Sequence, residues 1–142
     1  IQGGVADRGR AMNETAKNIL DTVPVGVMAT VNRDRTPAVA PLHFARMDDR
    51  IVWISNRTTR HAENAIRSGK VEFVAWNNKK QAVYLHTTAL VASDRDEELA
   101  LEAYAKKFGD FKPKGDLVEV YISPIGQLDE NSTTQNMWHF VA

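Results

Sequence analysis

The sequence predicts a mainly β protein of the α+β class, with an antiparallel sheet and flanking helices. Short apolar runs with strand periodicity recur along most of the chain, and hairpin-length gaps join most of them. Only three segments have helical spacing and helix-capping residues. A chain of 142 residues can form one domain with a substantial core. Six or so strands in so small a domain favour closure into a barrel.

The first half of the chain predicts a helix, three strands and a second helix. Asn13 suits the N-cap of the first helix, and Pro24 ends it. Pro41 places its strand at a sheet edge or a bulge, and Gly69 suits the C-cap of the second helix. The elements expected, in order, are a helix over 12–23, strands over 25–32, 38–46 and 50–55, and a helix over 59–68.

The second half predicts five strands around the clearest helix of the chain. Ser93 opens this helix, acidic residues crowd its first turns, and Lys106 and Lys107 lie in its last turn, as the helix dipole favours. Residues 111–115 form a loop. The elements expected are strands over 70–77 and 81–92, a helix over 93–108, and strands over 117–123, 125–128 and 137–141.

Composition excludes several classes of protein. Lys and Arg total 18, as do Asp and Glu, so the zero net charge argues against general binding of nucleic acid or anionic membrane. No apolar run is long enough to span a bilayer or to form a signal peptide, so a cytoplasmic location is expected. The chain has no cysteine, which excludes disulfides and thiolate chemistry. Residues 1–11 are expected to be a disordered arm or an expression remnant, and 12–142 the single domain.

The turn after the strand at 50–55 carries the strongest functional signal. Arg57, Arg60 and His61 stand among small hydroxyl and amide side chains, directly before a helix. Free backbone N–H groups, the helix dipole and two guanidinium groups would meet there, and together they attract a phosphate. The alternative is a solvated helix cap with surface arginines.

Other functional signatures are weak or missing. No G-x-G-x-x-G motif follows a strand, and Gly69-Lys70 lacks the upstream glycine of a P-loop. The histidines show neither H-x-H nor H-E-x-x-H spacing, so no metal site is expected, and no G-x-S-x-G elbow supports a hydrolase. The tryptophans suit core or interface positions, with Trp138 the one expected to be most free for ligand stacking or dimer contact.

Three segments resemble the pyridoxamine 5'-phosphate oxidase-like family of FMN-binding split barrels. Residues 26–32 with 36–41 are similar to its opening hairpin. Ile54-Ser55 with Thr59-Arg60-His61 resembles its strand end and Ser-Arg-Lys phosphate clasp, and Gln81 opens a long strand at the expected place. The resemblance implies a six-stranded, antiparallel split β-barrel with flanking helices. It also implies a homodimer that binds two FMN between its subunits.

The resemblance also implies roles for particular residues. The isoalloxazine ring would be lined, largely through backbone groups, by Val27, Met28, Ala29 and Thr30. Ile54 and Ser55 would lie under the ring and ribityl chain, and the phosphate would be held by Thr59, Arg60 and His61. Gln81 would reach the flavin across the dimer interface, and Trp138 matches a C-terminal tryptophan near the flavin. No catalytic acid or base is expected, because hydride transfer needs none.

The implied function is an FMN-dependent oxidoreductase that passes electrons from a reduced nicotinamide to a small organic acceptor or oxygen. The sequence departs from the family pattern at two places that bear on this implied function. His61 replaces a lysine, so its positive charge depends on protonation unless Arg57 compensates. Residues 138–142 lack the arginine-bearing segment that holds vitamin B6 substrates, so a different substrate is expected. The alternatives are a split barrel that binds deazaflavin coenzyme or heme, with His43, His86 or His139 as axial ligand, and a flavin-free structural or regulatory dimer.

Overall fold

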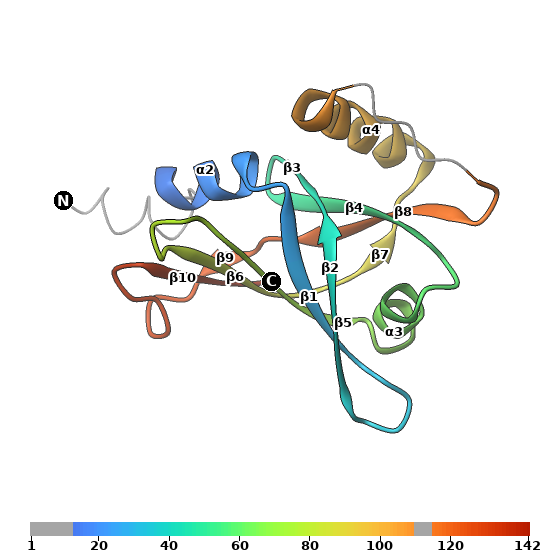
Figure 1. Ribbon diagram of the computed structural model, residues 1–142, viewed down its shortest axis with the longest axis horizontal. Helices are drawn as coiled ribbons and strands as arrows, with labels where there is room; N and C mark the ends of the chain where they lie inside the picture. Colours follow the sequence, from blue (N-terminus) through green and yellow to red (C-terminus); the bar gives the residue numbers. More distant parts are fainter. Residues whose placement is uncertain (1–12, 110–114) are drawn as a thin grey trace.

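The computed structural model describes residues 13–109 and 115–142, which form three helices and ten strands (Figure 1). The arm expected over 1–11, the first residue of the helix expected over 12–23, and residues 111–114 of the loop expected over 111–115 lie outside the described residues. The helices are α2 (Glu14–Thr22), α3 (Arg60–Ser68) and α4 (Asp94–Phe108). The strands are β1 (Val25–Val31), β2 (Pro37–His43), β3 (Ala45–Met47), β4 (Arg50–Asn56), β5 (Lys70–Trp76), β6 (Ala82–Thr88), β7 (Leu90–Val91), β8 (Val118–Pro124), β9 (Gln127–Leu128) and β10 (Met137–Val141).

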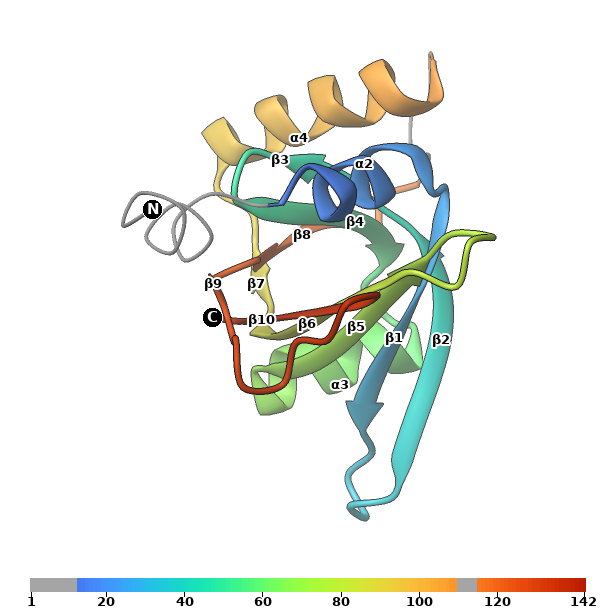
Figure 2. The same cartoon turned by 90° about the vertical axis from the view of Figure 1, so that its left-hand side faces the viewer.

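The strands form two sheets that do not close into one barrel. The larger sheet has the order β2-β1-β5-β6-β10-β9, and the smaller sheet has the order β3-β4-β8-β7. All pairs are antiparallel except β6 with β10, which run parallel. Figure 2 shows the two sheets facing each other, with the helices outside and at the ends. The mainly β split barrel with flanking helices is therefore confirmed, whereas the expected closure is wrong.

Two predicted long strands are each divided between the sheets. The run over 38–46 breaks at Phe44, so β2 pairs in the larger sheet and β3 in the smaller one. The run over 81–92 breaks in the same way at Ala89, between β6 and β7. Both break residues are buried in the main core. Apolar residues therefore continue through the bend, which is why the sequence pattern did not reveal it.

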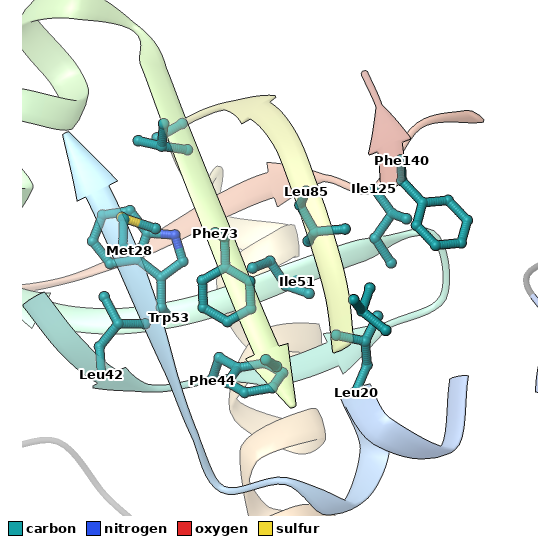
Figure 3. Packing of buried hydrophobic residues seen from close by; sticks show 14 of the residues in the cluster. Leu20, Met28, Leu42, Phe44, Ile51, Trp53, Phe73, Leu85, Ile125 and Phe140 are labelled. Carbon is teal, nitrogen blue, oxygen red and sulfur yellow. The ribbon is translucent and has the colours of Figure 1, made fainter. Parts of the chain in front are cut away.

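The main core fills the space between the two sheets (Figure 3). The rings of Phe44 and Phe73 meet edge to face at 4.9 Å, and those of Trp53 and Tyr121 stack at 4.3 Å. Helix α2 contributes its buried apolar face from one side, and α3 does so from the other. The ends of the split barrel are thus closed by helices rather than by strand pairing.

Helix α4 covers the outer face of the smaller sheet and forms a second apolar cluster there. Tyr104 anchors it, because its hydroxyl donates a hydrogen bond of 2.9 Å to the carbonyl of His43. Lys107 links it to two other elements: Nζ donates to the carbonyls of Leu20 (3.1 Å) and Phe44 (2.7 Å). Within the residues described, no helix is both long and apolar enough to cross a membrane.

Candidate functional site

The turn between β4 and α3 is held by hydrogen bonds that Asn56 accepts. Its side-chain oxygen accepts from the backbone N–H of Thr58 (2.9 Å) and from that residue's hydroxyl (2.7 Å). Thr59 is the N-cap of α3: its hydroxyl donates to the Asn56 carbonyl at 2.8 Å and accepts from the amide of Ala62 at 3.4 Å. The first amides of a helix have no partner within it, so the amides of Arg60 and His61 begin α3 at a positively polarised point.

His61 is joined to the end of β4. Its Nε2 lies 2.7 Å from the hydroxyl oxygen of Ser55, and its ring packs 5.8 Å from that of the buried Trp53. Burial lowers the pKa of the His61 imidazole below its usual value of 6.5. The histidine at the lysine position is therefore neutral at physiological pH in the ligand-free protein, and positive charge at the turn comes from arginine.

The two arginines of this turn differ in their partners. Arg57 lies 3.8 Å from the carboxylate of Glu119 on β8. In contrast, no acidic group within 4.0 Å pairs with Arg60 in the described part of the chain, and its side chain lines an open hollow. Arg57 is thus turned toward β8, and Arg60 is the arginine placed to meet an anion.

The four residues expected on the ring side do not share one environment. Met28 is fully buried in the core, and the buried Thr30 accepts a hydrogen bond of 3.2 Å from the Asn64 side chain. Val27 and Ala29 face outward and line a shallow apolar hollow on the larger sheet. The backbone of Val27, Met28 and Ala29 pairs with β2 on one side and β5 on the other. The flavin contacts expected from these residues stay a prediction, with most of their backbone groups already engaged in the sheet.

Strand β2 has a backbone edge without a strand partner, which β1 does not have. It is one of the two edge strands of the larger sheet, the other being β9, so one side of its backbone has no strand partner in the described part of the chain. It also contacts β4, whose end carries Ile54 and Ser55. Pro41 lies on this edge strand, as its missing N–H requires. The free backbone edge on this side of the larger sheet belongs to β2. Local sequence does not encode this, because it depends on strand order.

Gln81 and Trp138 lie apart from the β4–α3 turn. Gln81 precedes β6 in the β5–β6 turn, where its side-chain oxygen accepts a hydrogen bond of 2.9 Å from Asn77. That turn and α3 lie at opposite ends of the larger sheet in both views (Figures 1 and 2). Trp138 is 8% exposed and packs in the main core, whereas Trp76 is 50% exposed. The expectation that Trp138 would be the tryptophan most free for contacts is wrong, because its side chain lies on the core-facing side of β10, whereas the neighbouring Met137 is 44% exposed.

The outward face of the larger sheet carries a polar chain that the sequence did not suggest. His86 lies 2.5 Å from the carboxylate of Glu72 through Nδ1, and 2.8 Å from Nδ1 of His139 through Nε2. The His139 ring stacks on Tyr84 at 4.4 Å. These residues lie on three neighbouring strands, so only sheet register reveals their contact. Within the described residues, no group of three or more metal-ligating side chains is placed to hold a metal ion.

A protein-family profile matches most of this chain. The profile of the family described as Pyridoxamine 5'-phosphate oxidase matches residues 12–125. No curated protein matches the sequence significantly.

Three solved structures show the same fold at low sequence identity. A NimC/NimA family protein from Clostridium acetobutylicum is 21% identical, with a TM-score of 0.64 over 88% of this chain and 90% of that one. A FAD-binding protein from Mesorhizobium loti is 17% identical, with a TM-score of 0.63 over 80% and 88%. The heme storage protein HutZ from Vibrio cholerae is 14% identical, with a TM-score of 0.66 over 78% and 87%.

Proposed function

The chain belongs to the pyridoxamine 5'-phosphate oxidase-like split-barrel family, and from this premise we propose that it is an FMN-binding oxidoreductase. The observation that carries the proposal is the β4–α3 turn. Ser55, Thr59, Arg60 and His61 come together there, at the positive end of a helix. This arrangement suits a phosphate group on a flavin.

At the phosphate end, each residue has a distinct part. Arg60 supplies the guanidinium, and the first amides of α3 supply backbone donors. Thr59 and Ser55 supply hydroxyl groups. His61 is neutral without ligand, and a bound phosphate beside it would favour the imidazolium form and raise its pKa.

At the ring end, Val27, Met28, Ala29 and Thr30 remain the predicted neighbours of the isoalloxazine ring, and the open edge of β2 offers further backbone groups. Strand β2 contacts β4, which carries Ile54. Gln81, at the far end of the larger sheet, contacts the same flavin only if it comes from a second subunit. Trp138 remains a predicted neighbour of the flavin from within the core.

We further propose that two copies pack through the outward face of the larger sheet. This face lies opposite the buried side chains of Met28 and Thr30, and α3 contacts the Thr30 side through Asn64. Val39 is 73% exposed on it, and Val27, Ala29 and Val74 line its apolar hollow. Uncovered apolar strand surface of this kind is typical of subunit interfaces.

A bound FMN would supply the hydride and electron chemistry between a reduced nicotinamide and a small organic acceptor or oxygen. The residues of this chain would position it rather than react. The turn at the start of α3 holds the charged end, and the β2 edge orients the ring. Trp53 and the main core behind them exclude water from one side.

An absorbance scan of the purified protein, before and after addition of FMN, tests the proposal. Bound flavin gives two bands, in the near ultraviolet and the blue, and binding of added FMN shifts them. A folded protein that remains colourless and ignores FMN in both redox states would overturn the proposal.

Heme is the second candidate, and one observation favours it. His86 and His139 form a hydrogen-bonded pair on the outward face of the larger sheet. If a second subunit does not cover this face, either histidine can serve there as axial ligand. A Soret band after heme addition, lost in His139→Ala and retained in His43→Ala, would support heme over flavin.

A further inference from the structure

A second hollow of the molecule shares no lining residue with the predicted flavin-binding set. Helix α4, strand β3 and the end of α2 line this open space of about 530 Å³. The apolar side chains of Met47 and Leu99 line it beside the carboxylates of Asp21 and Glu102. Lys107 also lines the hollow, and its amine has no part in the proposed flavin chemistry.

The amine of Lys107 is held in a partly buried position. Nζ donates hydrogen bonds to the carbonyls of Leu20 (3.1 Å) and Phe44 (2.7 Å), and it lies 3.7 Å from the centre of the Phe44 ring. The side chain is neither fully buried nor fully exposed, whereas that of Lys106, one residue earlier, is exposed. The two lysines therefore share one stretch of sequence but differ in their surroundings, so Lys106 is the natural reference for Lys107.

Burial brings the neutral form of this amine close to physiological pH. It lowers the pKa of Lys107 from 10.5 to about 8, although the carboxylate of Asp21 raises it. A neutral amine keeps two N–H groups and gains a lone pair, and the carbonyls of Leu20 and Phe44 can accept both N–H groups. The contacts of Nζ are therefore compatible with the form of lysine that reacts as a nucleophile.

We propose that Lys107 is an acylation site that reacts with small activated acyl groups, the acyl phosphates and acyl thioesters, which enter through the hollow. The lone pair of Nζ attacks the carbonyl carbon of the acyl group and forms an N–C bond. The bond from that carbon to the phosphate oxygen or to the thioester sulfur breaks, and the leaving group takes the electron pair. Nζ loses one proton to water, so the product is a neutral amide and no oxidation or reduction takes place.

Acylation changes the contacts that join α4 to the rest of the fold. An amide nitrogen has one N–H group and no charge, so it cannot donate to two carbonyls at once. One of the carbonyls of Leu20 and Phe44 then loses its donor, and the positive charge beside the Phe44 ring is removed. The modification therefore loosens the link of α4 to α2 and to the bend between β2 and β3.

Acetylation rates of Lys107 and Lys106 in the folded protein test the proposal. The protein is treated with acetyl phosphate, and in a second arm with acetyl-coenzyme A, over a range of pH, and the modified peptides are quantified by mass spectrometry. At about pH 7.5 we expect Lys107 to react about threefold or more faster than Lys106, because more of it is neutral, an advantage that lower basicity and partial burial reduce. The rate at Lys107 should level off above about pH 8. In the urea-unfolded chain it should keep rising beyond about pH 9, because an ordinary lysine has a pKa of about 10.4.

Lys107→Arg and Lys106→Arg are matched variants, because each removes one amine and keeps its positive charge. Lys107→Arg should remove the fast-reacting site, and Lys106→Arg should leave it in place. Acetylation should lower the urea midpoint of the wild type and of Lys106→Arg, and it should change that of Lys107→Arg less. The pH profile of the wild type needs neither variant, so it decides the proposal even if a variant folds poorly.

Two results would overturn the proposal. In the first, Lys107 reacts no faster than Lys106 in the folded protein with either acyl donor. In the second, its rate keeps rising with pH in the folded protein as it does in the unfolded chain. Fast reaction with one donor alone supports the proposal and identifies phosphate or thiol as the leaving group. These results do not depend on whether the protein binds a flavin, so the proposed function is tested separately.

Discussion

Ser55, at the end of β4, and His61, in the first turn of α3, share a hydrogen bond of 2.7 Å between Oγ and Nε2. The bond ties the smaller sheet to the start of the helix and keeps the imidazole partly buried beside Trp53. The same burial lowers the pKa of His61. Protonation of the His61 imidazole therefore affects the group that joins β4 to α3.

The first prediction concerns stability at acidic pH. The unfolded chain protonates His61 near its usual pKa of 6.5, and the folded chain does so only at lower pH. The unfolded state thus binds more protons in that window, so stability is complete above about pH 6.5 and falls as the pH is lowered through it. His61→Gln removes this titration and should flatten the curve, as measured by urea unfolding from about pH 8 to 5. If the unfolding free energies of wild type and His61→Gln fall in parallel with pH, His61 is not the titrating group. The pKa of His139 is also lowered, but His139 is present in both proteins and contributes equally to both curves.

The second prediction concerns the arginine at the phosphate position. Arg60→Ala should weaken FMN binding by about 1.5–3 kcal/mol, the scale of a charge-assisted hydrogen bond. Arg57→Ala is the matched control, because that side chain is turned toward Glu119, and it should cost much less. Titration calorimetry measures both. Equal losses would mean that general charge, rather than the placement of Arg60, governs binding.

The third prediction concerns the subunit interface. Val39→Lys places a charge at a 73% exposed position on the outward face of the larger sheet and should convert a dimer to monomers, since burying an unpaired ammonium is costly. Leu90→Lys, at a 64% exposed position on β7 of the smaller sheet, should leave the dimer intact. Sedimentation velocity distinguishes the species. A dimer that survives Val39→Lys would place the interface elsewhere.

The fourth prediction concerns the lysine that joins three elements. Lys107→Met leaves the buried carbonyls of Leu20 and Phe44 without their donor and removes an ammonium 3.7 Å from the Phe44 ring centre. We expect a loss of about 1–3 kcal/mol in unfolding free energy. Lys106→Met, its exposed neighbour, should change stability by less than about 0.5 kcal/mol. Denaturant unfolding that gives equal midpoints for both variants would refute the role of Lys107.

The sequence predicts the elements of this fold well, because strand periodicity and helix caps are local signals. Asn13, Ser93 and Gly69 cap their helices as expected. The breaks at Phe44 and Ala89 were missed because a strand that changes sheets keeps its apolar pattern. The parallel pairing of β10 with β6 depends on long-range topology, which no local pattern encodes.

For the candidate site, the sequence located the β4–α3 turn but not its surroundings. Ser55 and His61 lie close in sequence, so their contact follows from the turn itself. The position of Arg33 beside α3 depends on how the β1–β2 hairpin folds back, and the exposure of the β2 edge depends on sheet order. Both are properties of the tertiary arrangement.

The parallel β6–β10 pair also has a consequence for biosynthesis. The ribosome completes β6 long before it reaches residues 137–141, so the nascent chain carries β6 with one unpaired edge during this interval. An open, apolar edge can recruit strands from other chains. Synonymous changes that slow translation between β8 and β10 should therefore increase inclusion-body formation without altering the mature protein.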